Sequence, residues 1–163
     1  MLVLTRKAGD SVDILNEIKV TVEEITDLDG RPIRGGAVQL GFESPRHVTI
    51  VRSELDFKKG NGSSGKRRKR TQHSGSTVKV PNATVLLSID LPQQVPVKWH
   101  GQAALHVVQA GGEIDSDRTV WRLVCHCNDL INICHNIDIL IVDLKRFQFA
   151  STDQGQNAAS RIG

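Results

Sequence analysis

A strand, a turn and a second strand are predicted for residues 38–51, whose sequence is VQLGFESPRHVTIV. Apolar residues dominate both ends of this stretch, and Ser44-Pro45 interrupts it. Proline fixes its own backbone angle and removes a hydrogen-bond donor, so this interruption is typical of a turn. The stretch therefore predicts strands over 37–42 and 47–51 and favours a β fold in this part of the chain.

Two further strands are predicted upstream. Residues 1–5 are mostly apolar, and over residues 18–25 apolar and polar residues alternate with the period of a half-buried strand. Turn signals lie between these two stretches at Gly9-Asp10 and Asn16-Glu17. The N-terminal region is thus predicted to hold four or five short strands.

The end of this region predicts a helical stub followed by a linker. Ser53 can cap a short helix over residues 52–59, which Gly60 would end. Residues 58–71 are rich in Gly, Ser, Lys and Arg and contain no apolar residue, which predicts a flexible basic tether. Five consecutive cations in it form a candidate phosphate-contacting arm: Lys66, Arg67, Arg68, Lys69 and Arg70.

The small size of the N-terminal unit predicts that it needs a partner. A unit of about 57 residues buries too little surface for a stable core of its own. The three cysteines of the chain are odd in number and crowded together, which argues against a secreted disulfide framework. No apolar run is long enough to cross a membrane, and the N-terminus lacks the pattern of a signal peptide. We therefore expect a cytoplasmic protein, not bound to a membrane, whose N-terminal unit is an obligate dimer.

Two sequence blocks in this region resemble a known family. Residues 1–10, MLVLTRKAGD, are similar to the hydrophobic first strand, Thr-Arg pair and Gly-acidic turn of the carbon storage regulator family (CsrA, also called RsmA). Residues 38–55, VQLGFESPRHVTIVRSEL, resemble that family's Gly-x-x-x-Pro turn, last strand and Arg-x-Glu-aliphatic signature. The resemblance covers residues 1–57 of the 163.

The resemblance implies both a fold and a function. The fold would be an intertwined homodimer, in which the first strand of one subunit lies beside the last strand of the other and two equal RNA sites form on opposite edges. The function would be post-transcriptional regulation without catalysis: recognition of GGA in hairpin loops of mRNA, occlusion of ribosome-binding sites, control of mRNA stability and carbon metabolism, and sequestration by small RNAs. Carried over by position, the RNA-binding residues are Leu4, Arg6, Lys7, Val48, Ile50 and Arg52.

The charge of this region leaves an alternative open. Residues 1–57 hold seven Lys and Arg against ten Asp and Glu, a balance that is unfavourable for binding a polyanion. The alternative is a dimerising scaffold or protein-interaction module that has lost specific RNA binding.

Residues 72–163 do not resemble the family and are predicted to form a separate α+β or mostly β unit of unknown fold and role. The pattern predicts strands over 83–89, 95–99, 119–126 and 137–144, and a helix over 102–110 ended by Gly111-Gly112.

A cysteine and histidine cluster is the one chemical constellation of this second half. A Cys-x-Cys pair puts both sulfur atoms on one face of a strand, so a zinc site using Cys125, Cys127, Cys134 and His135 is geometrically allowed. Free cysteine is more often simply buried, and a redox switch is the third interpretation of these cysteines. No catalytic triad, phosphate loop or acid pair is visible. The sequence therefore predicts no enzyme activity, no cofactor, no metal and no small-molecule substrate.

Overall fold

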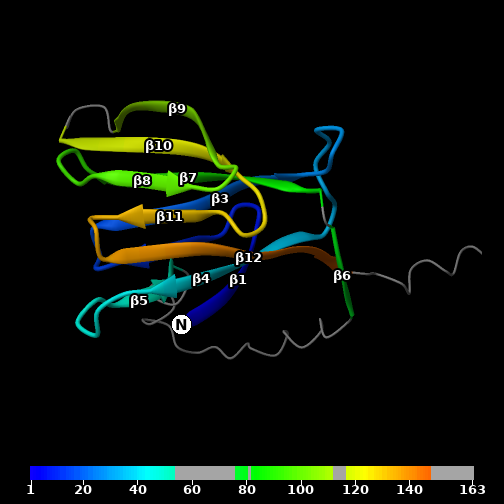
Figure 1. The fold of residues 1–163 in the computed structure, drawn as a ribbon, viewed down its shortest axis with the longest axis horizontal. Helices are drawn as coiled ribbons and strands as arrows, with labels where there is room; N and C mark the ends of the chain where they lie inside the picture. Colours follow the sequence, from blue (N-terminus) through cyan, green and yellow to red (C-terminus); the bar gives the residue numbers. More distant parts are fainter. Residues whose placement is uncertain (54–75, 81, 112–116, 148–163) are drawn as a thin grey trace, which may run out of the picture.

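The computed structural model describes residues 1–53, 76–80, 82–111 and 117–147, whose regular secondary structure is almost entirely β-strand (Figure 1). The mostly β fold class predicted from sequence is confirmed. In these residues the strands are β1 Leu2–Lys7, β2 Ser11–Ile14, β3 Ile18–Thr26, β4 Gly36–Glu43, β5 Ile50–Arg52, β6 Thr77–Lys79, β7 Thr84–Pro92, β8 Val97–His100, β9 Ala104–Gly111, β10 Arg118–Cys125, β11 Leu130–Ile133 and β12 Ile137–Phe147.

Both sheets of the fold combine strands from the two halves of the chain. One sheet has the order β1-β4-β12-β11-β8, with β6 also paired to β12, and the other has the order β5-β2-β3-β7-β10-β9. Neighbouring strands are antiparallel, and β4 pairs with β12 while β3 pairs with β7. The described residues of the two halves therefore interlock in one β-sandwich.

Aliphatic side chains fill the space between the two sheets. Leu40 of β4 lies between Leu4 of β1 and Ile141 of β12 in the register of its sheet, and all three side chains are buried. Val20 of β3 is buried in the facing sheet and belongs to the same core. Strand alternation places such residues on the inner face and polar residues on the outer face, which is why the pattern in the sequence predicted the strands.

The predicted strands are confirmed with small shifts at their ends, but three short strands were missed. These are β2 and β11, which have four residues each and lie between turns, and β6, which has three residues. The helix predicted over 102–110 is wrong, because residues 104–111 form β9 and pair along β10. The alanines in this stretch favour a helix, but pairing with an existing strand outweighs that weak local preference.

Several predictions fall on residues that the structure does not describe. Residues 54–59 of the predicted helical stub, the basic linker over 58–71 and the arm from Lys66 to Arg70 lie outside the described ranges. The described part of the chain holds no helix with the length and apolar character needed to cross a membrane.

Candidate nucleic-acid interface

Strands β1 and β5 lie at the same end of the sandwich, each at the edge of a different sheet (Figure 1). A surface pocket of about 350 Å³ joins them, because Leu2 of β1 and Ile50 of β5 both line it together with the turn residues 44–46. Within the described residues, no strand pairs with the outer edge of either β1 or β5. A free strand edge presents a row of unpaired backbone donors and acceptors, so this end of the molecule can hydrogen-bond to a ligand.

Arg6 and Lys7 point to opposite sides of β1, as adjacent residues of a strand must. Lys7 is exposed, and its Nζ lies 5.2 Å from the centre of the Phe147 ring. Arg6 is only 6% exposed; its Nε donates to the carbonyl oxygen of Thr5 at 2.8 Å, and its Nη1 donates to that of Ser11 at 3.3 Å. Because Ser11 belongs to β2 of the other sheet, Arg6 links the two sheets, whereas Lys7 faces solvent.

The remaining sequence-predicted residues also lie at this end of the sandwich, but their exposure differs. Arg52 is exposed at the end of β5, and Ile50 of the same strand is half-buried. Val48 precedes β5 and is buried, as is Leu4 of β1. The guanidinium group of Arg52 can give paired hydrogen bonds to a phosphate or to a guanine edge.

Two exposed basic residues of this region were not singled out from the sequence. Arg46 and His47 lie in the turn that begins at Pro45 and leads into β5, and Arg46 lines the pocket. The sequence signal that could have identified them is their position directly after Pro45. One acidic group also lies here, the carboxylate of Glu43, but the α-amino group of Met1 lies 3.6 Å from it. The exposed cations of this end suit binding of an anionic chain.

The cysteines and histidines of the second half do not converge on one point. Cys125 and Cys127 flank His126 at the end of β10, whereas Cys134 and His135 form the turn at the far end of β11. A strand of four residues spans about 13 Å. Among the residues that the structure describes, no group of three or more His, Cys, Asp or Glu side chains is placed to hold a metal ion.

Two of the cysteine thiols are held in their neutral form. Burial raises the pKa of Cys125 to about 12, and the carboxylate of Asp129 adds to the rise. Burial also raises the pKa of Cys127, with the carboxylate of Asp143 as the next cause, and the Cys127 thiol donates to the carbonyl oxygen of Val142 at 3.3 Å. Both thiols are therefore poor nucleophiles, because the thiolate is the reactive form.

We expect iodoacetamide to modify the three cysteines unequally in the folded protein. Cys134 is exposed and should react first, whereas Cys125 should stay unmodified at about pH 8, because its folded-state pKa lies far above that pH. Mass spectrometry of the peptides measures the modification, and in denaturant all three cysteines should react. Rapid modification of Cys125 without denaturant would contradict this expectation and revive the redox interpretation.

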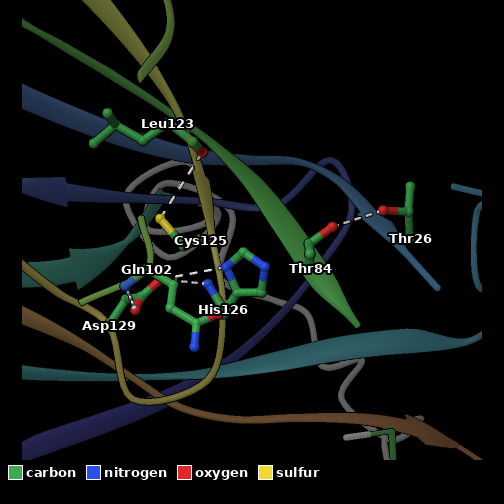
Figure 2. A network of polar contacts seen from close by, with 7 residues as sticks. All are labelled: Thr26, Thr84, Gln102, Leu123, Cys125, His126 and Asp129. Carbon is green, nitrogen blue, oxygen red and sulfur yellow. Dashed lines mark hydrogen bonds and ion pairs between the residues drawn. The ribbon is translucent and has the colours of Figure 1, made fainter. Parts of the chain in front are cut away.

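A buried carboxylate orders the loops beside Cys125 (Figure 2). Asp129 is 2% exposed, and its two oxygen atoms accept hydrogen bonds from the backbone N–H groups of Gln102 and His126, both at 2.6 Å. Nearby, the hydroxyl groups of Thr26 and Thr84 are 2.8 Å apart and join β3 to β7. The aspartate thus connects the loop before β9 to the loop after β10.

Comparison with known proteins assigns the N-terminal region. Residues 1–59 match the CsrA global regulator protein family. The translational regulators CsrA of Thermotoga petrophila, Pseudarthrobacter chlorophenolicus and Rhodopirellula baltica are 44%, 47% and 46% identical to the chain over 55 residues. These matches cover 34% of this chain and 57%, 61% and 67% of the three relatives. The chain belongs to the CsrA family.

The CsrA segment, residues 1–59, carries all of this similarity. The chain spans little more than half the length of several curated relatives, 57% of the Thermotoga petrophila protein for example. The names describe a regulator rather than an enzyme, and the family resemblance inferred from residues 1–10 and 38–55 is confirmed. No solved structure matches the chain.

Proposed function

We propose that this protein is a post-transcriptional regulator that binds mRNA through the end of the sandwich formed by β1 and β5. The proposal includes recognition of GGA in hairpin loops and occlusion of ribosome-binding sites in the cytoplasm. One observation carries it: the first and last strands of the CsrA segment meet at one end, where Lys7 and Arg52 are exposed.

The chemistry of this end supports binding to loop RNA. Unstacked bases of an RNA loop are recognised through hydrogen bonds to their edges and through stacking, and a free strand edge supplies donors and acceptors for such bonds. Lys7 and Arg52 supply positive charge for phosphates. Regulation would be steric, because a protein bound over a ribosome-binding site excludes the ribosome and needs no catalytic group.

The central test is a titration against a GGA-loop hairpin and a scrambled-loop control at near-physiological salt. Arg52→Ala is expected to weaken loop-dependent binding by about 1–3 kcal/mol, or roughly 5- to 150-fold, because a paired guanidinium contact is lost. Lys98→Ala is the matched control: Lys98 is an exposed cation on β8, which is the edge strand at the opposite end of β1's sheet. The affinity of the Lys98→Ala variant for the hairpin should stay near that of the unmodified protein.

The same titration decides between regulator and scaffold. Binding that ignores both the loop sequence and Arg52 would contradict the proposal, and would leave only non-specific attraction between cations and phosphate. The dimerising scaffold or protein-interaction module would then be favoured, in keeping with the excess of acidic residues in 1–57.

A further inference from the structure

The second half of the chain repeats the strands of the CsrA segment in a different order. Strands β10, β11 and β12 correspond to β1, β2 and β3 at positions 119 residues apart, as Ser11 and Leu130 are. Strands β7 and β8 correspond to β4 and β5 at positions 47 residues apart, as Ile50 and Val97 are. The last two strands of the repeated unit thus come first in the second half.

Backbone hydrogen bonds outside the strand ladders obey the same two correspondences. Gly9 donates to Val22, and Asn128 donates to Ile141, both at 2.7 Å. Leu15 donates to Thr49 as Cys134 donates to Pro96. Ile33 donates to Ile25 as Val80 donates to Leu144, and Val48 donates to Pro45 as Val95 donates to Pro92. Loop contacts of this kind are not required by strand pairing, so their coincidence identifies the same chain path.

Irregular backbone geometry also recurs at equivalent positions. The positive φ angles of Leu15 and Asn16, 59° and 61°, recur at Cys134 and His135 as 57° and 67°. The register shift in β3 falls between Val22 and Glu24, and the shift in β12 falls between Ile141 and Asp143. Bulges and left-handed residues are costly features that a fold keeps at defined places. Strands β7, β8, β10, β11 and β12 therefore fold as a permuted copy of the CsrA segment.

The copy occupies the strand edges that the CsrA segment would otherwise leave free. In that segment alone, β4 pairs only with β1, and β3 pairs only with β2. The second edge of β4 is paired with β12, and the second edge of β3 is paired with β7. Exchanging equivalent strands turns the order β1-β4-β12-β11-β8 into β10-β7-β3-β2-β5, which is the other sheet without β9. One chain thus pairs two equivalent units, as the resemblance implied for two subunits, but through different strands: β4 pairs with β12 and β3 with β7, whereas β1 and β8 lie at opposite edges of one sheet.

The two ends of this paired arrangement differ in their charged residues. Leu4, Val48 and Ile50 correspond to Leu123, Val95 and Val97, so the apolar positions are kept. The three cations are replaced: Arg6, Lys7 and Arg52 correspond to Cys125, His126 and Trp99.

The second end is also closed by additional packing. The ring of Trp99 lies edge-on to that of Trp121, with 5.9 Å between the ring centroids. Strand β9 pairs along the edge of β10 that would correspond to the free edge of β1. Arg118 of this end is engaged by Asp90, with Nε and the carboxylate oxygen 2.8 Å apart. Within the described residues, the edge of β10 is therefore covered, and no cation stands at the positions equivalent to Arg6, Lys7 and Arg52.

We propose that the protein is a monomer in which residues 84–147 take the place of a second CsrA subunit, and that it carries one RNA-binding end, β1 with β5. This inference rests on the proposed function and sharpens it, because it sets the stoichiometry at one RNA loop per chain. The second end serves to complete the fold. A second copy of the chain has no place on β3 or β4, since both edges of each strand are already paired.

Two measurements on the full chain test the proposal. Size-exclusion chromatography with light scattering should give the mass of one chain, 17.9 kDa. Native mass spectrometry with the GGA-loop hairpin should saturate at one hairpin per chain. Arg52→Ala should remove this loop-dependent complex, whereas Lys98→Glu, on β8 at the closed end, should leave one hairpin bound with affinity changed by less than about twofold.

The outcomes separate the parts of the proposal. A mass of two chains overturns the replacement of a second subunit, whatever the RNA result. A monomer that binds two hairpins, or a Lys98→Glu variant that loses one of two, overturns the single RNA-binding end. A monomer without loop-dependent binding overturns the proposed function and with it the single RNA-binding end. The mass of one chain would in that case still support the replacement of a second subunit by residues of the same chain.

Discussion

Replacing Leu40 by alanine is expected to lower the free energy of unfolding by about 3–4 kcal/mol, because the substitution leaves a cavity in an aliphatic core. Leu40 is fully buried on β4, between Leu4 of β1 and Ile141 of β12. Since β12 comes from the second half of the chain, the cavity weakens the contact between the halves. Urea denaturation followed by circular dichroism measures the effect.

Leu87→Ala is the matched variant for Leu40→Ala. Leu87 is the equivalent residue of β7, is fully buried, and lies between Leu123 of β10 and Val22 of β3. A loss of similar size is expected, and each variant should unfold in one transition, because the two halves share both sheets. Two transitions, with Leu40→Ala shifting only one, would show that the halves unfold separately and would contradict the interlocked fold.

Replacing Asp129 by alanine is expected to cost about 4 kcal/mol, because two backbone N–H groups lose their hydrogen bonds to a buried carboxylate. These groups belong to Gln102 and His126, and both hydrogen bonds are 2.6 Å long (Figure 2). Gly101 has a φ of +100°, and a Cβ at this position would collide with the Asp129 carboxylate, so the loop is built around that side chain. The same urea titration measures the loss.

Asp10→Ala is the control for Asp129→Ala. Asp10 holds the equivalent position, but it is less buried, and its carboxylate accepts a hydrogen bond from the N–H of Lys7 at 2.9 Å. A loss of about 1 kcal/mol is expected, because water can replace the acceptor. Equal losses of unfolding free energy for the two alanine variants would show that the contact to Gln102 adds nothing. The loss for Asp129→Asn should lie between those of Asp10→Ala and Asp129→Ala.

Local patterns were sufficient to predict much of the fold. The alternation in residues 18–25 and the turn at Pro45 predicted β3, β4 and the approach to β5, because apolar spacing and turn chemistry act over a few residues. They failed where local preference is weak. Strand β2 is only four residues long, and the stretch that becomes β9 favours a helix in isolation.

The candidate site was predicted from sequence in its composition but not in its geometry. The motifs singled out Lys7 and Arg52, which are exposed at one end of the sandwich. The same motifs singled out Arg6, whose side chain the structure buries against Ser11 of the facing sheet. Which side of an edge strand faces solvent depends on the sheet packed against it, and that sheet includes strands distant in the sequence.

The amino-acid sequence by itself determined the mostly β class, the membership of residues 1–59 in the CsrA family and the cations available for RNA. Only the tertiary structure decided that residues 84–147 repeat this segment and pair with it. The repeat is permuted, and over residues 38–50 and 85–97 it retains Val, Leu, Pro and Val at four equivalent positions, while most others differ. Apolar residues are interchangeable within a strand, and hydrogen bonding between distant strands has no local signal, so the pairing of the two halves is visible only in the folded chain.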